Sequence, residues 1–152
     1  MSLTRLLYAS RKTPDCQMQD VVSILDSARR RNSADQITGL LCFTNDYFLQ
    51  CLEGSRRAVN EAYRRILKDP RHTDVVLLHY QEASARDFGE GSMGYVAETP
   101  ETRAVVARSS DKDGLNPFSL NGDGALGLLR ELREETPRQQ ADTGTGQRAK
   151  VS

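Results

Sequence analysis

The 152-residue sequence lacks the features that mark several large classes of protein. Lysine plus arginine and aspartate plus glutamate both number 21, so the formal net charge is zero and no basic field favours nucleic acid or an anionic membrane. No stretch approaches the roughly 20 apolar residues of a membrane span, and the start of the chain, MSLTRLLYAS, is unlike a signal peptide. We therefore expect a cytoplasmic protein with no nucleic-acid partner and no membrane partner.

Cysteine and histidine are scarce as well. The three cysteines, Cys16, Cys42 and Cys51, show no CxxC spacing, and the two histidines, His72 and His79, are too few to complete a zinc site with them. The sequence holds neither a GxSxG nor a P-loop pattern, so hydrolysis and phosphoryl transfer find no local support. We expect thiols with a structural role and no metal site.

The apolar residues form a regular succession of short patterns. A hydrophobic content of 38% suits one domain with a core. Apolar runs predict strands, and apolar residues at helical spacing predict helices. The expected elements are a strand at 3–9, a helix from 17 to 31, strands at 37–44 and 47–53, a helix from 55 to 69 capped by Ser55, and strands at 73–80 and 92–97. This βαββαββ order predicts an α+β, ferredoxin-like fold: a mixed five-stranded sheet with two helices on one face.

The two expected helices each carry an apolar stripe that should face the sheet. The stripes consist of Met18, Val21, Val22, Leu25 and Ala28 in the first helix and Val59, Ala62, Tyr63, Ile66 and Leu67 in the second.

The C-terminal third of the chain should cover the other face of the sheet. Leu49 and Cys51 make that face apolar, so it needs a cover. The segment GDGALGLLRELREE predicts a helix at about 123–135 with Asp123 as its cap. Residues 136–152 have almost nothing to bury and should be disordered. We thus expect a core at 1–97, an extension at 98–135 and a disordered tail.

One polar residue interrupts the third expected strand. Alternation points Gln50 into the same core as Phe48 and Leu52. Burying its primary amide without partners costs about 1–3 kcal/mol. A backbone group, an internal water or some other polar group must therefore meet it.

Several short stretches, taken together and in order, resemble the BLUF domain, a flavin-binding blue-light sensor, in its short single-domain type. They are LLYAS, RRRNSADQITGLLCF, YFLQCLEG, ILKDPRH and RDFGEGSMG, and the likeness covers residues 3 to about 97. Each residue has an ordinary explanation when taken singly. Tyr8 could be a core tyrosine, Asn32 a left-handed residue after a helix, and Met93 a gap filler. The resemblance rests on their occurrence together.

The resemblance implies a bound flavin, FAD with FMN or riboflavin as alternatives, between the two helices on the face of Gln50. The Gln50 amide would then lie between the Tyr8 hydroxyl and the flavin ring, which answers the question of its partners. Asn32 matches the residue that bonds a polar edge of the ring. The further cofactor contacts implied by the family are Ile24, Arg31, Arg65, Ile66 and Asp69.

The family also implies a photochemical function without enzymatic activity. Tyr8 would pass an electron to the light-excited flavin, a proton would follow by way of Gln50, and the glutamine would end rearranged in a red-shifted signalling state. Met93, in the fifth strand, would relay this change. Because we find no second domain in the sequence, we expect a separate effector protein, and we expect a homo-oligomer.

One position departs from the family pattern. Many relatives carry a tryptophan two residues before the methionine, whereas this chain has Gly91 there and contains no tryptophan. Of the five tyrosines, only Tyr8 lies beside Gln50 in the expected sheet. We therefore expect Tyr8 to be the electron donor on which the photochemistry depends.

Two alternatives come from other classes of protein with similar strand order. An acyl-phosphate hydrolase would need an anion-binding loop before the first helix, but RKTPDCQ contains no glycine-rich loop. An RNA-binding module would need exposed aromatic residues on the central strands and a basic surface, and the balanced charge argues against it.

Overall fold

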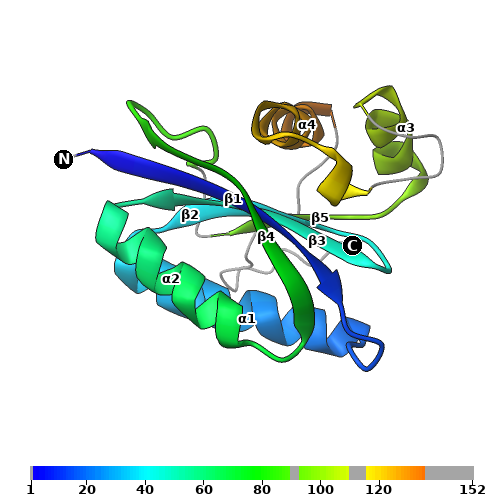
Figure 1. The fold of residues 1–152 in the computed structure, drawn as a ribbon, viewed down its shortest axis with the longest axis horizontal. Coiled ribbons are helices and arrows are strands. Elements are labelled where there is room, and N and C mark those ends of the chain that lie inside the picture. The colour runs from blue at the N-terminus through cyan, green and yellow to red at the C-terminus, as the bar shows by residue number, and fades with distance from the viewer. Residues whose placement is uncertain (1, 90–92, 110–115, 136–152) are drawn as a thin grey trace, which may run out of the picture.

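A computed structural model describes residues 2–89, 93–109 and 116–135 of the chain (Figure 1). Within these ranges, no helix combines the length and the apolar character needed to cross a membrane. Gly91 and the tail at 136–152, for which we expected disorder, lie outside the described residues.

The fold is built on one sheet with helices on both faces (Figure 1). Its five strands lie in the order β4-β1-β3-β2-β5, and all neighbours are antiparallel except the parallel pair β2 and β5. The strands are β1 Leu3–Lys12, β2 Thr38–Phe43, β3 Tyr47–Gly54, β4 His72–Ala83 and β5 Gly94–Ala97. This topology confirms the predicted α+β, ferredoxin-like sheet.

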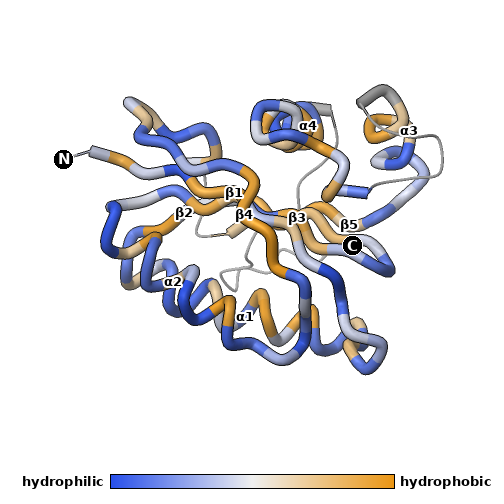
Figure 2. The backbone as a smooth tube through the Cα atoms, viewed as in Figure 1, coloured by the Kyte–Doolittle hydropathy of each residue, from blue (hydrophilic) through white to orange (hydrophobic). Residues whose placement is uncertain are grey.

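Two helices cover each face of the sheet. Helices α1 (Met18–Asp35) and α2 (Arg56–Lys68) lie on one face, and α3 (Pro100–Ser109) and α4 (Gly122–Glu135) on the other (Figure 1). The strands are mostly apolar, whereas α1 and α2 are polar with apolar residues at intervals (Figure 2). The predicted covering helix is therefore confirmed as α4. Helix α3 was not predicted, because its sequence, PETRAVVARS, offers only a short apolar run.

The strands send alternate side chains into two separate cores. In the register of β1 and β3, Leu7 faces Cys51, and both belong to the core beneath α3 and α4. The next pair, Tyr8 and Gln50, points to the opposite side, beneath α1 and α2. The predicted orientation of Gln50 is confirmed.

Helix α1 is longer than predicted. We expected it to end with the arginines at 29–31, but it continues to Asp35, and Gln36 with φ 58° takes the left-handed position after it. Asn32 therefore lies inside the helix and not after it. The physical reason is that the polar stretch RRRNSAD contains neither glycine nor proline, so nothing in it ends a helix.

The apolar stripes of the two helices are narrower than predicted. Met18, Val22 and Leu67 are 58%, 51% and 50% exposed, so assigning them to the buried stripes was wrong. Val22 and Leu67 each follow a residue that faces the sheet, Val21 and Ile66, and one residue along a helix turns the side chain by about 100°. The helices touch the sheet along a narrow line and leave room beside it.

The helix caps were partly predicted. The Ser55 hydroxyl accepts a bond from Ala58 N at 3.2 Å, which confirms it as the cap of α2. For α4 the prediction was wrong, because the Asn121 side chain accepts from Gly124 N at 2.7 Å and Asp123 lies within the first turn. There the Asp123 charge still suits the positive end of the helix dipole.

Candidate functional site

A cavity of about 200 Å³ lies among α1, α2 and the sheet. Strands β1, β2 and β3 contribute to its floor, and the facing sides of the two helices form its walls. Eight of the nine residues predicted from the sequence line it: Tyr8, Ile24, Arg31, Asn32, Gln50, Arg65, Ile66 and Asp69. The ninth, Met93, packs against Gln50.

A chain of three buried side chains lies at the floor of the cavity. Tyr8 Oη donates a hydrogen bond to Gln50 Oε1 at 2.5 Å, and Gln50 Nε2 donates to Met93 Sδ at 3.4 Å. All three residues are at most 5% exposed. Because a thioether is a weak acceptor, the amide oxygen of Gln50 is well satisfied and its nitrogen is not.

The sheet register fixes this chain of contacts. Tyr8 and Gln50 are directly paired across β1 and β3, where opposite side chains lie within about 5 Å. Met93 reaches Gln50 from just before β5 by passing over Gly39 of β2. A Cβ at Gly39 would lie 3.1 Å from the Met93 methyl and 2.0 Å from the Cys51 carbonyl oxygen. Gly39 was not predicted, and its role follows only from this close approach.

Tyr8 remains a protonated donor at neutral pH. Burial raises the pKa of Tyr8, and the nearby Asp69 and Tyr63 raise it further. The Tyr63 ring of α2 lies 5.9 Å from the Tyr8 ring between centroids, tilted by 47°. Tyr8 is the tyrosine paired with Gln50 in the sheet, and Tyr63, which we assigned to the second helix, lies beside the Tyr8 ring. The reason for this closeness is that α2 packs over β1 and β3, which strand assignments do not reveal.

Asn32 presents an unpaired amide to the cavity. It is 4% exposed, and its backbone oxygen accepts a hydrogen bond from Ile37 N at 2.8 Å. No described residue bonds its side-chain amide. Since buried amides are normally paired, this one is available to a ligand. Its neighbour Arg31 is exposed at the rim.

The end of α2 supplies a second polar group that was only partly predicted. Asp69 accepts two hydrogen bonds from the Arg71 guanidinium, at 2.9 and 2.7 Å, and these bonds lower the pKa of the Asp69 carboxyl. His72 Nε2 donates to the Ile66 carbonyl at 2.7 Å, so Nδ1 accepts from Ser10 Oγ at 2.8 Å. Arg71 and His72 also line the cavity. Both belong to the stretch ILKDPRH, whose last two residues were not assigned a role.

The residues of the cavity fit the ring of a flavin. Ile24 and Ile66 present apolar surface from facing helices, as a flat aromatic ring system requires. The amides of Gln50 and Asn32 offer donors and acceptors to its polar edge, and Arg71 offers a cation. The aromatic side chains of the central strands, Tyr8 and Phe48, are buried here at 4% and 3% exposure and present no open platform for RNA.

Fold and cavity together define a small α+β domain with a cavity between two helices whose lining suits a planar heterocycle. The family model described as BLUF, "Sensors of blue-light using FAD", matches residues 3–94. The chain belongs to the BLUF family of flavin-binding blue-light sensors.

Curated relatives include the "Blue light- and temperature-regulated antirepressor BluF" of Escherichia coli (strain K12), which is 34% identical over 121 residues. The "Photoactivated adenylate cyclase subunit beta" of Euglena gracilis is 45% identical over 87 residues. These matches cover 80% and 57% of this chain but only 30% and 10% of the two relatives. The chain therefore corresponds to a small part of each.

Solved structures of similar size match over most of their length. "BlsA ground state" has a TM-score of 0.79 at 30% identity, with 89% of this chain and 91% of that chain covered. "BlrB - a BLUF protein, dark state structure" has a TM-score of 0.74 at 32% identity, with 86% and 93% covered.

Proposed function

We propose that this chain is a blue-light receptor that holds FAD in the cavity, with Tyr8 as the electron donor and Gln50 as the switch. The observation that carries the proposal is the buried chain from Tyr8 through Gln50 to Met93. It joins a redox-active phenol to an amide that can rearrange and to a side chain just before β5. Asn32, Arg31, Arg65, Asp69 and the walls Ile24 and Ile66 would hold the cofactor.

The contacts of Gln50 suggest how the switch would work. When bound, the flavin absorbs blue light and, in its excited state, accepts an electron. Tyr8 would supply this electron, and its proton would move from Oη to Gln50 Oε1 along their hydrogen bond. When the electron returns to Tyr8, a proton returns to Tyr8 Oη as well. The amide would remain rotated, or it would remain in its imidic tautomer if Oε1 keeps the proton that it received and Nε2 gives up the one that is returned. Neither the protein nor the cofactor changes in composition.

Rotation of the Gln50 amide would change its contact with Met93. In the present arrangement an N–H group points at the sulfur and donates to it. After rotation the carbonyl oxygen would face that sulfur, and neither atom carries a hydrogen to donate. Met93 would therefore lose its contact and shift, which is the first step of the output that we propose.

Replacement of Tyr8 by phenylalanine tests the donor. We expect Tyr8→Phe to retain flavin, to lengthen its fluorescence lifetime strongly and to form no red-shifted state, because the phenol is gone while the packing remains. Time-resolved fluorescence and difference spectra measure both effects. Tyr63→Phe is the matched control, because its ring lies 5.9 Å from that of Tyr8. Rapid quenching that persists in Tyr8→Phe and disappears in Tyr63→Phe would assign the donor role to Tyr63.

The identity of the cofactor can be tested directly. We expect denaturation to release FAD, with FMN and riboflavin also accepted in reconstitution, because the contacts expected from Gln50 and Asn32 are to the ring, which the three flavins share. Chromatography of the released flavin identifies the cofactor. A protein that releases no flavin and takes up none when refolded with it would contradict the proposal.

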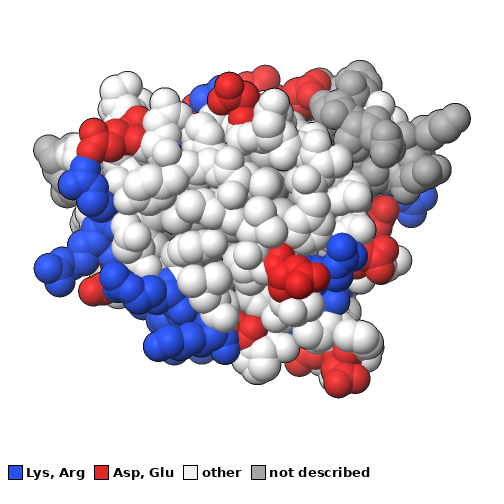
Figure 3. Space-filling model, viewed as in Figure 1, with Lys and Arg blue, Asp and Glu red and all other residues white. Residues whose placement is uncertain are grey.

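We propose two protein partners, a separate effector and a second copy of the chain. The face over β4 is largely uncharged in Figure 3, with charged side chains at its margins. On this strand Val76, Leu77 and Tyr80 are 42%, 48% and 45% exposed. An exposed apolar edge strand is a common site of protein contact. Light scattering on Leu77→Glu and the unmodified chain would show whether this strand joins two copies.

A further inference from the structure

The segment that leads from β4 towards Met93 is fixed to the sheet by a buried carboxylate. Glu53 of β3 accepts hydrogen bonds from the backbone nitrogens of Asp87 and Phe88, both at 2.9 Å. It also accepts from Arg5 Nε at 2.8 Å, and Arg5 and Glu53 are 5% and 1% exposed. Arg86 adds a bond to the Glu53 carbonyl at 2.9 Å. A buried carboxylate with this many partners holds them in place, because each partner that moves away leaves part of the buried charge without a hydrogen bond.

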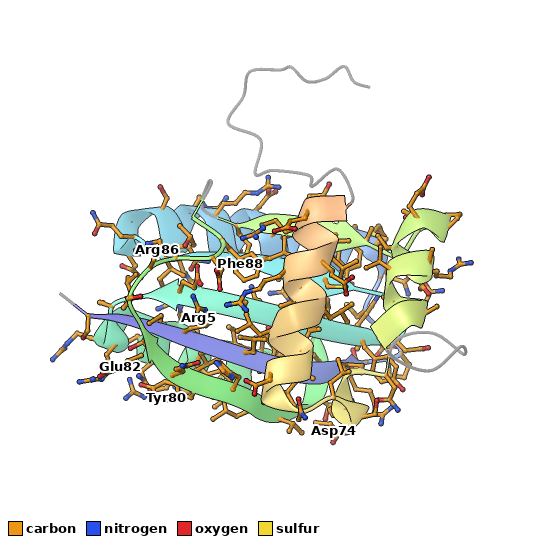
Figure 4. The ribbon with its side chains drawn as sticks, turned by 90° about the horizontal axis from the view of Figure 1, so that it is seen from above. Arg5, Asp74, Tyr80, Glu82, Arg86 and Phe88 are labelled. Carbon is orange, nitrogen blue, oxygen red and sulfur yellow. The ribbon has the colours of Figure 1, made fainter. Side chains whose placement is uncertain are left out.

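The same segment also holds α4. Asp87 Oδ2 accepts from Arg130 Nε at 3.0 Å and Nη2 at 2.6 Å, and it lies 3.0 Å from Arg5 Nη2. Arg133 donates to the Asp87 carbonyl oxygen, and its guanidinium lies 5.3 Å from the centre of the Phe88 ring. Figure 4, which looks onto this face, shows Arg5, Arg86 and Phe88 close together beside α4. Asp87 therefore connects the sheet, this segment and two arginines of α4.

The segment also passes from one core to the other. Phe88 is buried in the core beneath α4, whereas Met93, five positions later, is buried in the core of the cavity and contacts Gln50. Five residues span at most about 18 Å when extended, so only a short length of chain joins Met93 to the Asp87 region. Residues 90–92 lie outside the described part of the chain.

We propose that Asp87 is the positioning residue that couples the photoactive cavity to α4. Its carboxylate and carbonyl hold Arg130 and Arg133 in the dark. A shift of Met93, transmitted along the chain, weakens these contacts and loosens α4, while the Asp87 backbone nitrogen stays bonded to Glu53. This inference rests on the proposed function, since it requires that light displaces Met93. It adds a second output route, through the ion pairs beneath α4, to the route through β5.

Hydrogen–deuterium exchange of the α4 amides in flavin-loaded protein, in the dark and under blue light, tests the coupling. In the unmodified chain we expect illumination to raise exchange in α4 by about tenfold, a typical coupling between two sites. In Asp87→Ala we expect the red shift of the flavin to persist while dark and illuminated α4 exchange become equal. If Asp87 had a merely structural role, its loss would raise α4 exchange equally in the dark and under light and leave the light-to-dark ratio of exchange unchanged. Asp15→Ala is the control, because it deletes the same atoms from an exposed residue that bonds no other described side chain.

A second variant, Arg130→Gln, keeps the proposal testable if Asp87→Ala fails to fold. The side chain of Arg130 is 45% exposed, so Arg130→Gln removes the ion pair from the solvent side. Arg103→Gln is its control, because Arg103 is an arginine of α3 with a 62% exposed side chain that pairs with Glu98. Loss of the light-to-dark ratio in Arg130→Gln with a normal red shift supports the proposal. An unchanged ratio in Arg130→Gln, or no light effect on α4 in the unmodified chain, overturns it. Absence of the red shift in the unmodified chain would instead refute the proposed function itself.

Discussion

The two faces of the sheet are made by neighbouring residues of the same strands, yet they are built for opposite purposes. On the α4 face, Leu7 and Leu49 are fully buried among aliphatic side chains that fill the space. On the other face, their neighbours Tyr8 and Gln50 line a cavity and bond to each other. The α4 face is therefore a filled core, whereas the opposite face leaves a cavity for a ligand.

The difference teaches where stability and function reside in this domain. A filled aliphatic core gains the full hydrophobic and packing free energy. A face with a cavity and an unpaired amide forgoes part of it, and a ligand that binds only the folded state restores stability by mass action. Substitutions on the two faces should therefore affect different measurements.

Gln50→Leu should give the largest effect on the cavity face. The substitution makes this position apolar, like its neighbour Leu49, and removes the amide that bonds Tyr8 and Met93. We expect flavin to remain bound and the light-induced red shift to be lost completely. Difference absorption spectra measure this. Gln50→Glu is the control for packing, because it keeps an oxygen to which Tyr8 can donate. A normal light-induced red shift in Gln50→Leu would show that Gln50 is not part of the mechanism.

Leu129→Ala should give the largest effect on the α4 face. Leu129 is fully buried in α4, and such a truncation destabilises by about 2–5 kcal/mol. We expect urea denaturation to show this loss while the dark spectrum of the flavin stays unchanged. Leu67→Ala, in a helix but 50% exposed, should change stability by no more than about 0.5 kcal/mol. A large spectral change in Leu129→Ala would mean that the two cores are not separate.

The sequence was sufficient to predict which residues of the strands point to each face of the sheet. It was not sufficient to predict the contacts between segments that are distant in the chain. Alternation alone placed Gln50 opposite Leu49 and Cys51, because a strand allows no other arrangement. The closeness of Tyr63 to Tyr8 depends on the angle at which α2 crosses the sheet, which a helical stripe does not specify. The bonds of Glu53 to the backbone of Asp87 join a strand to an irregular segment, and no periodic pattern describes such a segment.

Asn32→Ala should have a moderate effect, confined to the cavity face. The amide has no partner among the described residues, so its deletion removes a hydrogen bond to the ligand and none within the protein. We expect flavin affinity to fall by about 0.5–1.5 kcal/mol, roughly 2- to 12-fold, with stability of the flavin-free protein nearly unchanged. Titration of the flavin-free protein measures this. Ser33→Ala, at the next and exposed position, is the control. A drop in flavin-free stability would show that Asn32 serves the fold.

The smallest effect that we predict concerns the acid sensitivity of the cavity rim. Hydrogen bonds from Arg71 hold the pKa of Asp69 below its ordinary value. A carboxyl whose pKa is lowered by folding stabilises the fold above its unfolded pKa, about 3.9, and loses that contribution as pH falls through the folded value. Asp69→Asn should therefore lower stability slightly at pH 7 and reduce its decline below about pH 4, an effect kept small because the pair is partly exposed to solvent. Urea midpoints measured across this range, with Asp15→Asn as control, test the prediction. An acid limb of the same steepness in Asp69→Asn and the unmodified chain would show that the rim adds no pH-dependent stability.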